Sequence, residues 1–147
     1  KGRYGVFRCK YDWAGDCQWA RAGGGSGEDN GYGVAIDGSG NAYITGYFEE
    51  TVDFDPGTGV DEHTSNGHYD VFLSKFDSTG DFQWARTWGG DDDDMGLGVA
   101  IDGSGNAYIT GEFEGTVDFD PGPEVELHSS NGVQDAFLVK FLPNGYW

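Results

Sequence analysis

Short runs of alternating apolar and polar residues, separated by glycine-containing turns, cover most of the chain. The clearest hairpin signal is the run VFLSKF at residues 71–76, the turn DSTG at 77–80 and the return run DFQWAR at 81–86. The aspartate side chain opens such a turn, and the glycine supplies the positive φ that closes a type I turn with a bulge. The runs at residues 33–37 and 41–46, joined by a turn at 38–40, predict another hairpin.

The sequence GVAIDGSGNAYITG occurs twice, at residues 33–46 and 98–111, so the chain is a tandem repeat with a period of 65 residues. The sequence QWAR recurs with the same offset, at residues 18–21 and 83–86. We therefore divide the chain into three parts. Residues 1–30 are the C-terminal hairpin of a first repeat, residues 31–95 are a complete repeat, and residues 96–147 are a second repeat that is truncated in its last strand.

Each complete repeat contains two predicted hairpins and thus four strands, with a long connection between them at residues 47–68. This connection includes TVDFDPG, in which residues 51–54 favour a short edge strand because Pro56 cannot donate to a ladder. The predicted fold is all-β, with tandem four-stranded antiparallel sheets that resemble the blades of a β-propeller. The residues that we expect in the core are Trp19, Trp84, Phe72, Phe137, Ile36 and Ile101.

Residues 37–46, 115–122 and 70–85 together resemble the bacterial SBBP-type β-propeller repeat. The resemblance covers nearly the whole chain, implies a propeller-like fold and an extracellular or cell-surface setting, and carries no catalytic residues. A closed ring needs about four to eight blades, which is more than 147 residues supply. We therefore expect the incomplete terminal strands to contact other copies of the chain or neighbouring repeats, and a stack that does not close would form a filament.

The chain is strongly acidic, with 26 Asp and Glu residues against 8 Lys and Arg residues and a formal net charge of −18. This charge argues against nucleic acids and anionic membranes as partners, because phosphate groups would be repelled. No apolar run approaches the roughly 20 residues of a membrane span. These features favour a non-catalytic structural or adhesive protein, and the alternative is a glycan- or protein-binding module of a larger secreted protein.

Pairs of aspartates in the long connections are the first candidates for calcium binding. Asp53 and Asp55 are separated by one residue, and Asp118 and Asp120 repeat the pair. In an extended segment the two carboxylates lie on one side, about 7 Å apart. Carboxylates and turn carbonyls are the oxygen ligands that Ca²⁺ prefers. The alternative is that these acids accept hydrogen bonds from turn amides and face solvent.

Other acidic positions give weaker indications of a metal. Asp29 and Asp94 recur at the repeat period before a predicted strand, and Asp94 ends a run of four acids that would ordinarily be a solvated loop. The sequence DGSGN at residues 37–41 resembles the start of a calcium loop, but Phe48 stands where an EF-hand has glutamate. The acid pairs recur in each copy, whereas an active site is normally built once, so we do not predict a glycosidase or another enzyme.

The two cysteines, Cys9 and Cys17, belong to the first hairpin alone. If Tyr11 lies opposite Cys17 across the turn, Cys9 lies diagonally opposite on the same face, a marginal but feasible geometry for a disulfide. In an extracellular protein we expect a bond between Cys9 and Cys17. The alternative is a pair of small buried thiols.

Overall fold

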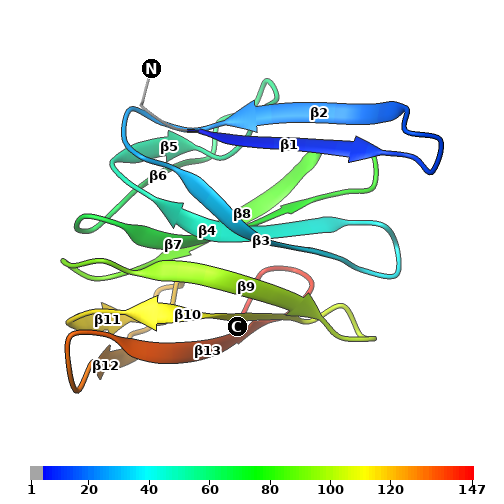
Figure 1. Cartoon of the computed structure of the whole chain (residues 1–147). Helices are drawn as coiled ribbons and strands as arrows, with labels where there is room; N and C mark the ends of the chain where they lie inside the picture. Colours follow the sequence, from blue (N-terminus) through cyan, green and yellow to red (C-terminus); the bar gives the residue numbers. More distant parts are fainter. Residues whose placement is uncertain (1–4) are drawn as a thin grey trace.

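The computed structural model of the chain describes residues 5–147, and these consist of β-strands joined by turns and loops (Figure 1). The strands are β1 (Val6–Tyr11), β2 (Cys17–Gly23), β3 (Asn30–Ile36), β4 (Ala42–Phe48), β5 (Thr51–Asp53), β6 (Glu62–Thr64), β7 (Asp70–Phe76), β8 (Phe82–Trp88), β9 (Met95–Ile101), β10 (Ala107–Phe113), β11 (Thr116–Asp118), β12 (Leu127–Ser129) and β13 (Asp135–Phe141). Equivalent strands of the second and third blades begin 65 residues apart, as β3 and β9 do.

The complete repeat forms one antiparallel sheet of four strands in the order β3-β4-β7-β8, which confirms the predicted blade. We call this sheet the second blade. The hairpin β1–β2 is the first blade, and the sheet β13-β10-β9 is the third blade. The three blades lie in successive layers, with the second blade between the other two (Figure 1). All three sheets are antiparallel, so the all-β class is confirmed.

The hairpin turns have the predicted chemistry. In the turn between β7 and β8, the Asp77 Oδ1 atom accepts hydrogen bonds from the backbone N–H groups of Thr79 and Asp81, at 2.9 and 3.0 Å. Gly80 closes the turn with a φ of 86°. The ladder shifts register between Lys75 and Phe76, next to the turn. Aspartate and glycine therefore fix this turn as the sequence indicated.

The long connection at residues 47–68 contains a small hairpin. Its first strand, β5, coincides with the predicted edge strand, and it pairs with β6, which was not predicted. Val52 and Phe54 point from this hairpin into the core and are 3% and 2% exposed. The connection thus covers the second blade with apolar side chains, and β11–β12 repeats the arrangement on the third blade.

Apolar side chains pack in two clusters, one at each junction between blades. The cluster at the first junction is made by Ile44, Phe48, Val52, Phe54, Phe72, Phe76 and Ala85, with Val6 and Phe82 packed against it. The cluster at the second junction includes Tyr43, Leu73 and Trp88 of the second blade and Ile109, Phe137 and Phe141 of the third. The predicted core positions Phe72 and Phe137 are buried.

The remaining predicted core residues lie at the margins. Trp84 and Ile101 are partly buried against the second cluster, and Trp19 is half-buried. The prediction for Ile36 is wrong, because its side chain is 56% exposed. Ile101, the equivalent residue of the next repeat, packs against the second blade, whereas the first blade contributes only β1 and β2 to cover Ile36.

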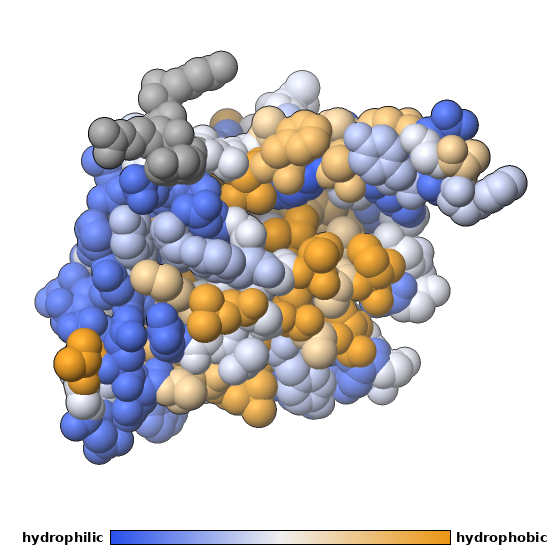
Figure 2. Space-filling view, in the orientation of Figure 1, coloured by the Kyte–Doolittle hydropathy of each residue, from blue (hydrophilic) through white to orange (hydrophobic). Residues whose placement is uncertain are grey.

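The uncovered face of the second blade lies in a groove of about 630 Å³ lined by β1 and β3. Val34 and Ile36 of β3 line this groove, as does Phe7 of β1. Figure 2 shows apolar side chains gathered beneath the hairpin at the top of the view, on the face that the groove opens. Within residues 5–147, no helix is long and apolar enough to span a membrane.

Candidate functional site: the junctions between blades

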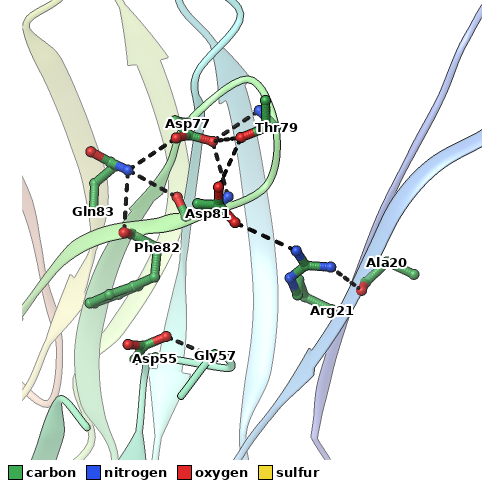
Figure 3. A network of polar contacts seen from close by, with 9 residues as sticks. All are labelled: Ala20, Arg21, Asp55, Gly57, Asp77, Thr79, Asp81, Phe82 and Gln83. Carbon is green, nitrogen blue, oxygen red and sulfur yellow. Dashed lines mark hydrogen bonds and ion pairs between the residues drawn. The ribbon is translucent and has the colours of Figure 1, made fainter. Parts of the chain in front are cut away.

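At each junction, a set of side chains from one blade contacts a β-turn of the next blade. We call this set the clasp. At the first junction, the Trp19 ring lies against Gly80, where a Cβ atom would sit 2.6 Å from the ring. The Lys10 Nζ atom donates a hydrogen bond to the Ser78 carbonyl at 3.3 Å. Arg21 forms an ion pair with Asp81 at 3.7 Å (Figure 3). Three side chains of the first blade, Lys10, Trp19 and Arg21, therefore hold one turn of the second.

The second junction repeats the clasp one period later. Lys75 Nζ donates to the Pro143 carbonyl at 2.9 Å, and Arg86 Nε donates to the Gly145 carbonyl at 2.9 Å. Trp84 lies against Gly145, where a Cβ atom would be 3.1 Å from its ring. The repeated sequence QWAR therefore supplies a tryptophan and an arginine that join each blade to the next. Sequence reasoning found the repeat but assigned no such role to the arginine.

The predicted metal candidates Asp29 and Asp94 are buried at the two junctions, with 2% and 0% exposure. Asp94 accepts a hydrogen bond from the Gly90 N–H at 2.6 Å and another from the Glu114 N–H at 3.1 Å. Asp29 accepts one from the Gly25 N–H at 2.7 Å. Burial raises the pKa of Asp94 to about 7 and also raises the pKa of Asp29. Both carboxyls therefore hold the loops that connect consecutive blades.

A further buried acid, Asp70, was not singled out from the sequence. It is 1% exposed, and its Oδ2 atom accepts hydrogen bonds from the backbone and side-chain N–H groups of Asn66, at 3.1 and 3.0 Å. Burial raises its pKa to about 6. Asn131 and Asp135 repeat this contact in the third blade, so the repeat period is the signal that could have identified the pair.

The aspartates of the long connections accept backbone hydrogen bonds. Asp53 Oδ1 accepts from the N–H groups of Asp55 and Asp61 at 3.1 and 2.9 Å, and Asp55 Oδ1 accepts from Gly57 at 2.7 Å. The second pair is arranged in the same way, with Asp118 Oδ1 3.1 Å from the Asp120 N–H group. These hydrogen bonds are those expected if the acids form turns rather than bind calcium. The two carboxylates of each pair nevertheless lie at the same turn.

The predicted metal residues do not converge on one centre. Among residues 5–147, no three His, Cys, Asp or Glu side chains gather closely enough to hold a metal ion. A calcium site at Asp53 and Asp55, or at Asp118 and Asp120, would therefore need carbonyl or water oxygens beside the two carboxylates. Calcium binding stays a prediction.

The disulfide between Cys9 and Cys17 is not formed in the structure, where both cysteines are free and exposed. Their exposure contradicts the alternative of buried thiols, and the disulfide expected in an extracellular protein stays a prediction. Tyr11 does lie opposite Cys17, as predicted, but Cys9 pairs with Ala20. The two cysteines are thus diagonal partners, with Cα atoms about 7–8 Å apart in such a ladder, and this is longer than disulfides usually span.

Four aromatic side chains form a continuous row at the end of the second blade, and we call it the aromatic row. The ring of His68 lies 4.0 Å from that of Tyr69, Tyr69 lies 4.4 Å from Tyr47, and Tyr47 lies 5.8 Å from Tyr32, all between centroids. Sequence reasoning missed this row, because its members come from three separate segments and lie outside the recurring sequences GVAIDGSGNAYITG and QWAR.

Comparison with known families supports the repeat architecture. Residues 18–47 match the sequence model of the SBBP family, described as Beta-propeller repeat. The match covers β3 and nearly all of β2 and β4, so it includes the connection between the first two blades. The family expected from the sequence thus matches at residues 18–47.

Two curated proteins are similar to the chain over most of its length. One is described as "Regulatory protein FlaEY" of Caulobacter vibrioides, with 27% identity over 99% of this chain and 15% of its own length. The other is an uncharacterized WD repeat-containing protein of Acanthamoeba polyphaga mimivirus, with 24% identity over 88% of this chain and 11% of its own length. The chain thus spans a small fraction of the length of each relative.

Proposed function

We propose that the chain is a non-catalytic, extracellular structural unit that assembles by stacking its blades on further blades. These come either from neighbouring repeats or from other copies of the chain, which would build a scaffold or filament. The observation that carries the proposal is the uncovered apolar face of β3. Val34 and Ile36 are 67% and 56% exposed, whereas the equivalent Val99 and Ile101 pack against the second blade. Because the equivalent face is covered at the second junction, the open face at the first junction is where further strands or a further blade would pack.

Sedimentation velocity over a range of protein concentrations, in physiological salt, tests this assembly. We expect the mass of the wild-type particles to rise with concentration. The double variant V34K/I36K should stay monomeric, because two charges would be buried on association. The control V125K changes a residue that is 67% exposed on a loop away from β3, and it should associate like the wild type. A wild-type chain that is monomeric at every concentration would contradict self-assembly.

Calcium is the cofactor that we propose for the acid pairs Asp53/Asp55 and Asp118/Asp120. Two carboxylates at one turn, in a chain with a net charge of −18, support this proposal. Thermal unfolding in millimolar Ca²⁺ and then in excess EDTA provides the test. A bound ion should raise the midpoint by several degrees, since a ligand that binds only the folded state stabilises it. An unchanged midpoint would assign these acids to turn formation alone.

The second candidate function is a module that binds a glycan or a protein, and the aromatic row favours it. Tyr32 and His68 at the two ends of the row are exposed, so the row presents an aromatic surface to solvent. Stacking of blades and binding at this surface are compatible, because Leu97, the residue equivalent to Tyr32, is still 44% exposed beside a complete blade.

A further inference from the structure

The aromatic row is made by residues that differ between the second and third blades. Residues 31–49 and 96–114 are identical except at two positions, where Tyr32 is replaced by Leu97 and Tyr47 by Glu112. These two substitutions lie 15 residues apart along the chain. The structure nevertheless brings the two tyrosine rings within 5.8 Å of each other. The only differences in this block therefore fall on residues that touch.

The same holds for the rest of the row. His68 and Tyr69 become Val133 and Gln134 in the next repeat, and both rings belong to the row. Asn30, which becomes Met95, donates a hydrogen bond from its side chain to the Tyr47 hydroxyl at 2.7 Å. The third blade folds into the same strands without any of these side chains, so the fold does not require the row.

The row is accessible in a complete blade stack. Tyr32 is 55% exposed in the first junction, where the preceding blade has only two strands. Leu97 occupies the equivalent position at the second junction, where the preceding blade has all four strands, and it is still 44% exposed. Tyr47 is 8% exposed and supports the row from beneath. A further blade would therefore leave the Tyr32 position open.

Three carboxylates surround the row. Glu28 accepts a hydrogen bond from the Tyr69 hydroxyl at 3.2 Å. His68 lies between Asp93, at 2.5 Å from its Nδ1 atom, and Glu49, at 3.5 Å from its Nε2 atom. The site thus combines aromatic rings with more negative than positive groups. Hydrophilic residues cover the left side of the view in Figure 2, where the ends of β4 and the start of β9 lie in Figure 1.

We propose that the aromatic row binds a positively charged group carried on a planar or apolar body, such as an arginine side chain of a peptide. Ring faces attract cations through their quadrupole, and guanidinium groups also stack on aromatic rings. The carboxylates add a negative potential that favours the same ligand and repels anions. This inference goes beyond the proposed assembly and does not depend on it. Tyr47, His68 and Tyr69 lie outside the groove beside β3, and the position equivalent to Tyr32 stays exposed next to a complete blade.

The test is an NMR titration of the ¹⁵N-labelled chain, at a concentration where sedimentation finds it monomeric. The probe is the peptide acetyl-Gly-Arg-Gly-Arg-Gly-amide, and the control peptide carries citrulline, which is planar but neutral, in place of arginine. We expect saturable shifts of the Tyr32, Tyr47 and Tyr69 amides with the arginine peptide. The citrulline peptide should bind at least about tenfold more weakly, and 0.5 M NaCl should weaken arginine binding.

Variants that copy the next repeat separate binding from folding. Y32L and the pair H68V/Y69Q install the residues that the third blade tolerates, so both should fold and should weaken binding by about tenfold. The reciprocal variant L97Y/E112Y places two rings on the third blade and should create a second set of shifting amides. Equal affinities for both peptides would overturn the proposal. The proposal would also be overturned if cellohexaose bound saturably and the arginine peptide did not bind. Variants that lose stability but keep wild-type affinity for the arginine peptide would overturn it as well.

Discussion

Replacing Gly80 by alanine tests the clasp at the first junction. Gly80 has a φ of 86°, and an added Cβ atom would lie 2.6 and 2.7 Å from the Cδ2 and Cγ atoms of the Trp19 ring. The left-handed conformation costs alanine about 1 kcal/mol. The ring must also move by about 1 Å to restore ordinary contact, and such overpacking costs about 1–3 kcal/mol more. We therefore expect G80A to lower the free energy of unfolding by about 2–4 kcal/mol.

The matched control is G15A, at the turn of the first hairpin. Gly15 has almost the same φ, 88°, but a Cβ atom there would have no neighbour within 4 Å. G15A should therefore show only the conformational cost of about 1 kcal/mol. Urea denaturation followed by tryptophan fluorescence gives both free energies. If G80A and G15A are equal within error, Trp19 does not pack on this turn and the clasp is refuted.

Three more predictions concern the two junctions. I101K should lower the free energy of unfolding by about 2 kcal/mol or more, whereas I36K should change it by less than about 0.5 kcal/mol, as urea denaturation of the monomer will show. R86M should destabilise the chain by about 1–2 kcal/mol, because the hydrogen bond to Gly145 is lost. The comparison variant R86K keeps the positive charge but lacks the guanidinium group that makes this hydrogen bond. Because burial raises the pKa of Asp94 from 3.8 to about 7, its protonated form stabilises the fold below pH 4, and this contribution is lost as the pH rises through 7. Stability should fall by up to about 2–3 kcal/mol between pH 5 and 8, and D94N should reduce this fall; an unchanged fall in D94N would contradict the assignment.

The sequence predicted the strands well, because each hairpin carries its own turn chemistry. Asp77 and Gly80 fix one turn locally, and the 65-residue period transfers the same reasoning to every copy. The short strand β6 was missed because its three residues, Glu62 to Thr64, show little alternation. Its pairing with β5 depends on Phe54 packing into the core, which is a tertiary effect.

Burial was harder to predict than strand position. Ile36 and Ile101 occupy identical local sequences, so no pattern within the repeat distinguishes them. Their difference in exposure comes from the blade that precedes each one. The clasp was missed for a similar reason, since Arg21 and Asp81 are 60 residues apart and meet only when the blades stack.

Some candidate sites could be found from the sequence and others could not. Asp29 and Asp94 were identified by their recurrence, and both are buried at junctions. The aromatic row has the opposite signature, since Tyr32 and Tyr47 stand out only where two nearly identical copies differ. Comparing copies for their differences, as well as for their shared motifs, would have located this row before the structure did.

The most direct test of blade stacking is an NMR measurement of the contact between Trp19 and Gly80 in the monomeric chain. We expect nuclear Overhauser effects between the indole protons and the Gly80 Hα protons, with those Hα resonances shifted upfield by the ring. The equivalent contact between Trp84 and Gly145 should give the same pattern. If neither glycine shows the effect and both Hα resonances have ordinary shifts, consecutive blades do not stack through the clasp.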